Sequence, residues 1–347
     1  MSRIISDDIG SYPLPGWVER EEMERIALGI ITGEVIDSER DNFNRIVSEI
    51  MQQKINSGLK RPNYPQIQDM VSEFFSLIDK FSEPSEPWVV GEEFSRIPEI
   101  DSIKEIGKRF YEEKGKALEL RICVTGPLEI YLKRVGNQIQ PDLLNNLAKS
   151  VSRFVENSLV SKEYMETMTV AIDEPSLGLN PNISYNREDL IKGWEIATKS
   201  AKGRDVQIHL HSPNDVDLIY EVDGIGIIGV ESAENPQAID EIDKEDLELY
   251  DKFLRVGIAR TNFNGIVSVY NEKFNRDVWK DENFNEAISV MESRRTIENR
   301  LKSAYKIFGD RILYAGPDCG LGSWPTQESA LILLKNVAAA VDRFNKM

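Results

Sequence analysis

The sequence has only two cysteines, Cys123 and Cys319, among its 347 residues. So few cysteines cannot form a disulfide framework, and a reducing compartment is the natural expectation. Long apolar runs are also missing, because no stretch reaches the roughly 18 apolar residues of a membrane span. The first residues, MSRIISDDIGSYP, lack the apolar segment of a signal peptide. We therefore expect a cytoplasmic protein that has no membrane partner.

Positive charge is in short supply as well. The chain has 42 Lys and Arg against 59 Asp and Glu, a formal net charge of −17. Such a surface repels phosphate backbones, so we expect no nucleic-acid partner. Hydrophobic residues still make up 41% of the chain, which is enough for a sizeable core. The absence of a low-complexity linker predicts a single domain over 1–347.

Short apolar runs alternate with helical patterns along the chain. Strands are predicted at 117–126, 168–175, 205–212, 224–232, 253–260 and 311–318. Helices are predicted at 186–201, at 285–308 and after Pro325, with extra helices within 14–115. Proline-rich loops are predicted at 60–66 and 82–88. The strand runs are apolar and β-branched rather than strictly alternating, which is typical of parallel strands covered by helices. Because no G-x-G-x-x-G motif follows the first strand, we predict a (β/α)8 TIM barrel rather than a doubly wound sheet.

Polar residues stand at the carboxyl ends of four predicted strands, where barrels of this kind carry their function. They are Asp173 and Glu174, His209 and His211, Glu231, and Asp318 with Cys319. Three of these residues, His211, Glu231 and Cys319, offer one nitrogen, one oxygen and one sulfur. That donor set suits a catalytic zinc ion, which takes three protein ligands and keeps one position open. Each residue alone is more often structural, so the spacing leaves both interpretations open.

An ordered set of short blocks resembles the C-terminal catalytic domain of cobalamin-independent methionine synthase, in its short archaeal-type form. This family belongs to the uroporphyrinogen decarboxylase/methionine synthase superfamily. The blocks are IGSYP (9–13), PQIQDMVSEFF (65–75), TGP (125–127), IDEPSL (172–177), QIHLH (207–211), VES (230–232) and GPDCGL (316–321). They extend over nearly the whole chain. The resemblance implies a zinc-dependent barrel that transfers a methyl group to homocysteine and forms methionine.

The resemblance also implies roles for particular residues. His211, Glu231 and Cys319 match the family's zinc ligands, and zinc would convert the homocysteine thiol to a thiolate at neutral pH. The family's carboxylate that holds the amino group matches Asp173, and Glu174 is a further substrate-binding candidate. Ile9 and Ser11 match backbone positions that hold the amino and carboxylate ends of the substrate.

Several positions depart from the family pattern. Where the family has a second cysteine ligand the chain has Pro213, which cannot bind a metal, and Asp215 is a possible replacement. Gln66 stands near a family carboxylate and remains a substrate-binding candidate. Asn262 stands near the usual place of a histidine and, with Asp173, is a candidate catalytic residue.

The methyl donor stays open at the level of sequence. A chain of this length has no room for the N-terminal barrel with which the long enzymes hold methyl-folate. Three alternatives remain for the donor: a free methyl-pterin or folate, a methyl-pterin presented by a separately encoded N-terminal-type barrel, or a methylated corrinoid protein. Two other functions also stay open: another superfamily enzyme, such as a uroporphyrinogen decarboxylase-like protein or another thiol methyltransferase, and a non-catalytic paralogue that acts as a binding partner.

Overall fold

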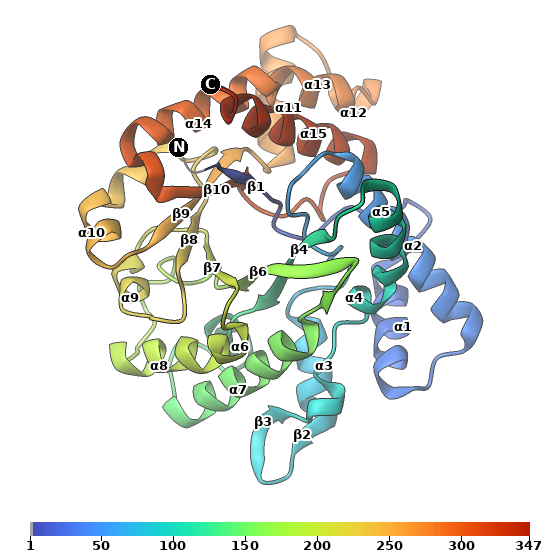
Figure 1. Ribbon diagram of the computed structural model, residues 1–347, viewed down its shortest axis with the longest axis vertical. Helices are drawn as coiled ribbons and strands as arrows, with labels where there is room; N and C mark the ends of the chain where they lie inside the picture. The colour runs from blue at the N-terminus through green and yellow to red at the C-terminus, as the bar shows by residue number, and fades with distance from the viewer. Residues whose placement is uncertain (1–2) are drawn as a thin grey trace.

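The computed structural model describes residues 3–347, and its centre is a parallel sheet surrounded by helices (Figure 1). The strands follow one another in the order β1-β10-β9-β8-β7-β6-β4, and every neighbouring pair is parallel. Their bounds are Ile5–Ser6 (β1), Leu118–Thr125 (β4), Met165–Asp173 (β6), Asp205–Leu210 (β7), Ile227–Val230 (β8), Phe253–Ala259 (β9) and Ile312–Pro317 (β10). A short strand β5 (Ser161–Lys162) pairs antiparallel with β6. The predicted TIM-barrel class is confirmed.

The segment 61–66 lies between β1 and β4 and continues the sheet from one to the other. Asp7 forms a parallel bridge with Arg61, and Asn63 forms one with Arg121. The segment therefore occupies the position of the second barrel strand. As predicted, residues 60–66 form no regular helix or strand, and the prolines, which cannot donate to a ladder, leave isolated bridges in place of a continuous strand.

Helices cover the outside of the sheet. Those of the N-terminal part are α1 (Arg20–Thr32), α2 (Asp37–Asn56), α3 (Ser72–Phe81), α4 (Pro98–Ser102) and α5 (Lys104–Lys114). The remaining ones are α6 (Pro127–Arg134), α7 (Pro141–Ser158), α8 (Arg187–Thr198), α9 (Val216–Tyr220), α10 (Lys244–Leu249), α11 (Phe263–Phe274), α12 (Val278–Asp281), α13 (Phe284–Met291), α14 (Arg294–Phe308) and α15 (Gln327–Phe344). The five helices α1 to α5 confirm the predicted helical elaboration. Within residues 3–347, no helix combines the length and apolar composition needed to cross a bilayer.

Two predicted elements differ from the structure. The proline-rich stretch 82–88 forms a hairpin of β2 (Ser82–Glu83) and β3 (Glu86–Val90), which projects beyond α3 in Figure 1. The predicted helix 285–308 is two helices, because Ser293 accepts a hydrogen bond from the Thr296 amide and starts α14 anew. The residue before it, Glu292, is buried between the side chains of Arg260 and Arg300.

The interior of the barrel contains charged groups as well as apolar ones. Asp7, Arg121 and Arg255 are all fully buried there. Asp7 Oδ1 accepts a hydrogen bond from Arg255 Nε at 3.0 Å, and the Ile9 carbonyl accepts one from Arg121 Nη1 at 2.7 Å. These contacts fix the first strand and the residues after it against β4 and β9, so residues 5–9 are part of the barrel.

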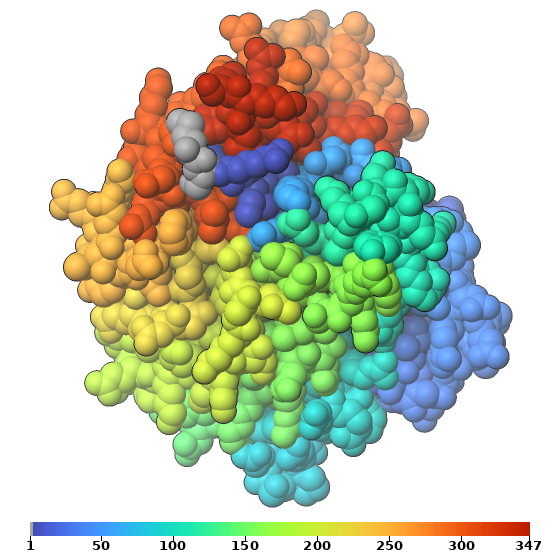
Figure 2. Space-filling model, in the orientation of Figure 1, coloured from blue at the N-terminus to red at the C-terminus, as the bar shows by residue number. Residues whose placement is uncertain are grey.

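The two ends of the described chain meet. Asn345 donates to the Ile4 carbonyl at 2.8 Å and accepts from the Ile4 amide at 3.0 Å. Figure 2 shows the blue N-terminal segment lying against the red C-terminal helices. Residues far apart in sequence therefore build one rim of the barrel.

Candidate metal centre and its cavity

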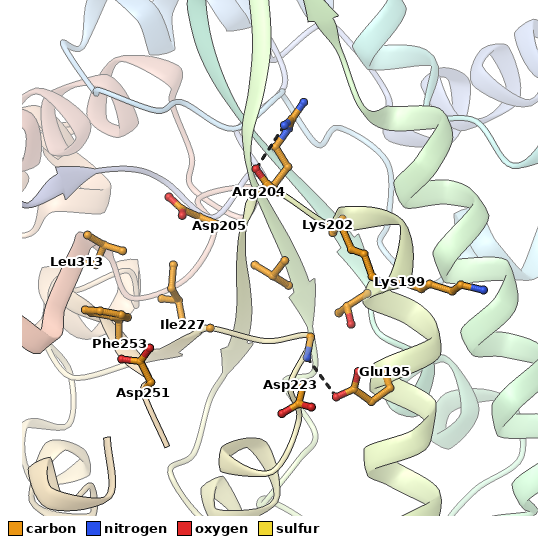
Figure 3. Close-up of a pocket in the computed structure, with 16 residues that line it drawn as sticks. Glu195, Lys199, Lys202, Arg204, Asp205, Asp223, Ile227, Asp251, Phe253 and Leu313 are labelled. Atoms are coloured by element: carbon orange, nitrogen blue, oxygen red, sulfur yellow. Dashed lines mark hydrogen bonds between the residues drawn. The ribbon is translucent and has the colours of Figure 1, made fainter. Parts of the chain in front are cut away.

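Two cavities lie at opposite ends of the barrel. The larger, of about 670 Å³, is lined by residues at the amino ends of the strands, among them Asp205, Ile227 and Phe253 (Figure 3). Its charged side chains are of both signs, for example Lys202 and Asp223. Active sites of barrels of this type lie at the carboxyl ends of the strands. The smaller cavity, of about 330 Å³, lies at the carboxyl ends and is therefore the candidate active site.

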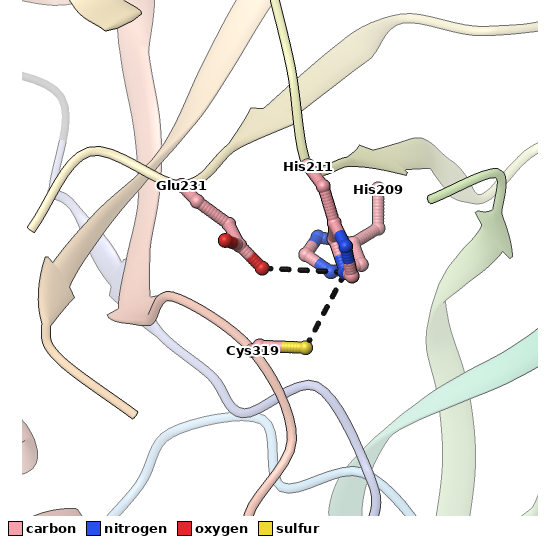
Figure 4. Close-up of side chains that lie close together, drawn as sticks. All are labelled: His209, His211, Glu231 and Cys319. Carbon is pink, nitrogen blue, oxygen red and sulfur yellow. Dashed lines mark hydrogen bonds and ion pairs between the residues drawn. The ribbon is translucent and has the colours of Figure 1, made fainter. Parts of the chain in front are cut away.

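Four side chains with metal-binding atoms converge at the carboxyl ends of β7, β8 and β10. They are His209, His211, Glu231 and Cys319, and their ligand atoms all lie within 4.8 Å of one another (Figure 4). His211 Nε2 lies 3.3 Å from Glu231 Oε1 and 3.5 Å from Cys319 Sγ. The structure thus brings together the three predicted ligands and adds His209, and the group could hold a metal ion.

Burial controls the electrostatics of this group. It raises the pKa of Glu231 from 4.5 to about 7, together with the nearby Asp318 carboxylate. It raises the pKa of the Cys319 thiol, with the Glu231 carboxylate acting in the same direction, and it lowers the pKa of the His211 imidazole. All three shifts favour neutral groups. A cation among them would therefore supply the positive charge that this site lacks.

Asp318 joins the loops that carry two of the candidate ligands. It is 1% exposed, and its carboxylate accepts from the amides of Ser232 (3.0 Å), Ala233 (2.9 Å) and Glu234 (2.7 Å). These amides follow Glu231 in the loop after β8, whereas Asp318 precedes Cys319 in the turn after β10. The sequence placed Asp318 at a strand end, but it gave no sign of this bracing role.

The smaller cavity opens beside the metal-binding side chains. Four predicted substrate-binding residues line it, namely Ile9, Ser11, Gln66 and Asp173. Asp173 is 4% exposed, and its Oδ1 has no hydrogen-bond partner within residues 3–347. Burial raises the pKa of Asp173, and the Arg121 guanidinium opposes that effect. Asp173 is thus a buried acceptor available to a ligand.

The turn that contains Ser11 is hydrogen-bonded to the turn that contains Cys319. The Ser11 carbonyl accepts from the Leu321 amide at 2.9 Å, and Ser11 Oγ accepts from the Gly322 amide at 3.1 Å. A Cβ on Gly320 would lie 1.9 Å from Ser11 Oγ, so only glycine fits at this position. Ser11 therefore positions the turn of a candidate ligand as well as lining the cavity.

Several residues that line the cavity were not predicted as contacts. Arg20 reaches the cavity from α1 and donates to the Ile67 carbonyl at 3.1 Å. Gln68 and Met70 contribute to the same wall. Arg20 gave no signal in the sequence, because it lies on a helix more than 40 residues before the segment that it meets.

Glu174 and Asn262 lie outside the cavity. Glu174 is fully buried, and its carboxylate accepts from the amides of Leu128 (3.0 Å) and Glu129 (2.6 Å) and from Trp194 Nε1 (2.8 Å). It therefore caps the N-terminus of α6. Asn262 is exposed and caps α11 by accepting from the Gly265 amide at 3.0 Å.

Pro213, which replaces the family's second cysteine, and Asp215, its possible substitute, do not add a metal donor. Pro213 is buried, and its carbonyl accepts from the Val216 amide at 3.1 Å. Asp215 is exposed, has a left-handed backbone with φ 62°, and precedes α9. Within residues 3–347, Asp215 is not part of the group that could hold a metal.

No family model matches the sequence, and no curated protein sequence is similar to it. Solved structures do share its fold. A B12-independent methionine synthase from Shewanella sp. W3-18-1, in complex with selenomethionine, superposes with a TM-score of 0.62 at 14% identity, over 99% of this chain and 98% of that one. A protein described as a vitamin-B12 independent methionine synthase from Listeria monocytogenes gives a TM-score of 0.57 at 13% identity, over 99% and 98%.

A methyltransferase from Methanosarcina mazei gives a TM-score of 0.50 at 12% identity, over 97% of this chain and 94% of that one. At these identities the likeness establishes the fold. The whole chain therefore has the barrel architecture of B12-independent methionine synthase structures, and in fold the resemblance seen in the sequence blocks is confirmed.

Proposed function

We propose that this protein is a zinc-dependent methyltransferase that moves a methyl group to the thiol of homocysteine and forms methionine. The observation that carries the proposal is the nitrogen, oxygen and sulfur donor group of His211, Glu231 and Cys319 beside a cavity that contains an unpartnered carboxylate oxygen. The solved neighbours described as methionine synthases support it, and one of them is a complex with selenomethionine, an analogue of the product.

The donor distances fit zinc. Bond lengths of about 2.0–2.1 Å to nitrogen or oxygen and about 2.3 Å to sulfur place tetrahedral ligand atoms about 3.3 to 3.6 Å apart. The 3.3 Å and 3.5 Å distances from His211 Nε2 to Glu231 and Cys319 agree with these values. The mixture of soft sulfur and imidazole favours zinc over magnesium or calcium. A zinc ion held there would lower the pKa of the homocysteine thiol and make it a nucleophile at neutral pH.

The residues of the cavity would hold and orient the amino acid. The ammonium group needs an acceptor, since burying it unpaired is costly, and Asp173 Oδ1 is available for it. The carboxylate can face Arg20 and the turn that contains Ile9 and Ser11. With both ends of the amino acid fixed, the side-chain thiol points toward the metal-binding side chains, which is the orientation that the transfer requires.

The methyl donor would approach from the open mouth of the cavity. A volume of about 330 Å³ suits an amino acid and part of a second molecule. A methylcorrinoid gives up its methyl group without a proton on the leaving group, whereas a methyl-pterin needs one. Because Asn262 is exposed and occupied as a helix cap, it is a poor proton donor. We therefore favour a methylcorrinoid over an unassisted folate donor.

Turnover of the purified protein tests the proposal. Zinc-loaded protein is mixed with homocysteine and either methylcobalamin or methyl-tetrahydrofolate triglutamate, and methionine is measured. Methionine from methylcobalamin is the expected result. Asp173→Asn should raise the KM for homocysteine at unchanged zinc content, with Ser323→Ala as the control within the same cavity. Homocysteine that fails to bind the zinc-loaded protein in calorimetry, together with no methionine from either donor, would contradict the proposed function.

A further inference from the structure

His209 has a buried ring whose two nitrogen atoms have no partner. The residue is 2% exposed, and neither Nδ1 nor Nε2 makes a hydrogen bond within residues 3–347. A buried polar atom without a partner costs about 1–3 kcal/mol, and such atoms are rare in folded proteins. The ring therefore needs a partner that the polypeptide itself does not provide.

The position of His209 shows which partner fits. Residues i and i+2 of a strand point to the same side, so His209 on β7 and His211, directly after the end of that strand, both face the donor group. The two rings are 5.3 Å apart between centroids and nearly perpendicular, at 73°. Figure 4 shows the four side chains around a common centre, with His209 behind His211. The ring nitrogen of His209 lies within 4.8 Å of the other ligand atoms.

A separation of at most 4.8 Å is close to the separation between two ligand atoms of one zinc ion. Tetrahedral ligand atoms around zinc lie about 3.3 to 3.6 Å apart, so the ring nitrogen has to approach by about 1.5 Å at most. A rotation of the imidazole about its side-chain bonds covers such a distance. The three other donors need no comparable movement, because His211 already lies at tetrahedral distances from Glu231 and Cys319.

The second ring nitrogen also has a suitable neighbour. Asp173 on β6 is the register partner of His209 on β7, and its buried Oδ1 has no hydrogen-bond partner in the described chain. Metal-binding histidines usually donate their other N–H to a carboxylate, which fixes the ring orientation. A carboxylate oxygen can accept two hydrogen bonds, so Asp173 Oδ1 can serve the ring nitrogen and the substrate ammonium together.

We propose that His209 is a fourth ligand of the metal and that the resting site is a four-donor set of two imidazoles, one carboxylate and one thiolate. This inference rests on the metal site of the proposed function. The deep position of His209 closes the inner side of the site, and the substrate thiol then enters from the cavity as a fifth ligand or in place of one donor. Zinc permits such an expansion to five ligands.

Metal spectroscopy on the whole protein tests the assignment. X-ray absorption of the zinc-loaded protein should count two imidazoles in the wild type and one in His209→Gln. The cobalt-loaded protein should show an altered ligand-field spectrum in His209→Gln, while the thiolate-to-cobalt absorption from Cys319 persists. We expect zinc affinity to fall about 100-fold or more, which exceeds the usual effect of a residue behind a ligand. His211→Gln is the comparator that must lose a ligand, and Ser323→Ala is the control that must not.

Unfolding in the presence of a chelator separates this role from a structural one. His209→Gln should unfold like the wild type without metal and should lose most of the stabilisation that zinc adds. A count of one imidazole in the wild type, or an unchanged cobalt spectrum in His209→Gln, would overturn the inference and leave the proposed function intact. Wild-type protein that binds no zinc would overturn both. Two imidazoles in a protein that forms no methionine would overturn only the proposed function.

Discussion

Glu99 is a buried carboxyl group beside the cavity wall, and its replacement by glutamine should change how stability depends on pH. It lies in α4, is 1% exposed, and accepts from Gln68 Nε2 at 3.0 and 3.2 Å. Burial raises its pKa from 4.5 to about 7, and the Gln68 hydrogen bond opposes this. A second carboxyl group, Glu73, has its pKa raised by burial and by the charge of Glu99.

The sign of the effect follows from the raised pKa. Between pH 4.5 and 7 the folded protein keeps a proton on Glu99 that the unfolded chain has released. The contribution of Glu99 to stability is therefore complete below pH 4.5 and is lost as the pH rises through 7. A pKa difference of about 2.5 corresponds to about 3 kcal/mol. Most of it, about 2 to 3 kcal/mol, is lost between about pH 5 and pH 8.

Urea denaturation of wild type and Glu99→Gln at several pH values between about 5 and 8 measures this loss. The amide stays neutral and still accepts from Gln68, so the variant should equal the wild type near pH 5 within about 1 kcal/mol and exceed it near pH 8 by about 2 to 3 kcal/mol. Glu112→Gln, which removes an exposed carboxylate on α5, should follow the wild type. Parallel stability curves for wild type and Glu99→Gln would refute the reasoning.

Three further substitutions test the structure. Glu292→Gln should lower the free energy of unfolding by about 3 kcal/mol, because Arg260 and Arg300 would then face a buried neutral amide. The control Glu49→Gln removes an exposed ion pair and should cost less than about 0.5 kcal/mol. Urea denaturation measures both losses, and equal losses would contradict this prediction. Gly126→Ala should lower the thermal midpoint at a cost of about 2 kcal/mol, since its Cβ would lie 2.1 Å from Glu174 Cδ; an unchanged midpoint would show that this carboxylate moves freely. Asp318→Asn should weaken zinc binding about 10-fold or more in chelator competition, because its carboxylate holds the loop that follows Glu231. Unchanged zinc affinity would show that these hydrogen bonds do not position the metal ligands.

The six predicted strands are all present, for a simple physical reason. A strand buried on both faces is mostly apolar, and each of these runs is, apart from buried polar residues such as Arg121, Gln207 and Arg255. The donor residues were visible for a related reason, because parallel strands bring their carboxyl ends to one rim. Polar residues directly after apolar runs, such as His211, Glu231 and Cys319, could therefore be expected to meet.

The features that the sequence did not reveal depend on contacts between distant segments. The proline-rich loop 61–66 gave no sign that it completes the sheet, because its isolated bridges form only once β1 and β4 are in place. The cap role of Glu174 requires the N-terminus of α6 to arrive beside β6, and spacing along the chain does not show this. His209 stood next to a predicted ligand, but its burial and unpartnered nitrogens are visible only in three dimensions.

The metal-binding group couples the two ends of the chain. Cys319 lies in a turn that hydrogen-bonds to Ser11, and Ser11 is placed by β1, which pairs with β10. His211 and Glu231 come from β7 and β8 in the middle of the barrel. The donors can therefore reach their observed spacing only after the first strand has docked and the barrel has closed. A metal that binds only the closed form must stabilise it, by about 2.7 kcal/mol at a free concentration about 100 times the dissociation constant. We therefore expect metal binding to be coupled to closure of the barrel.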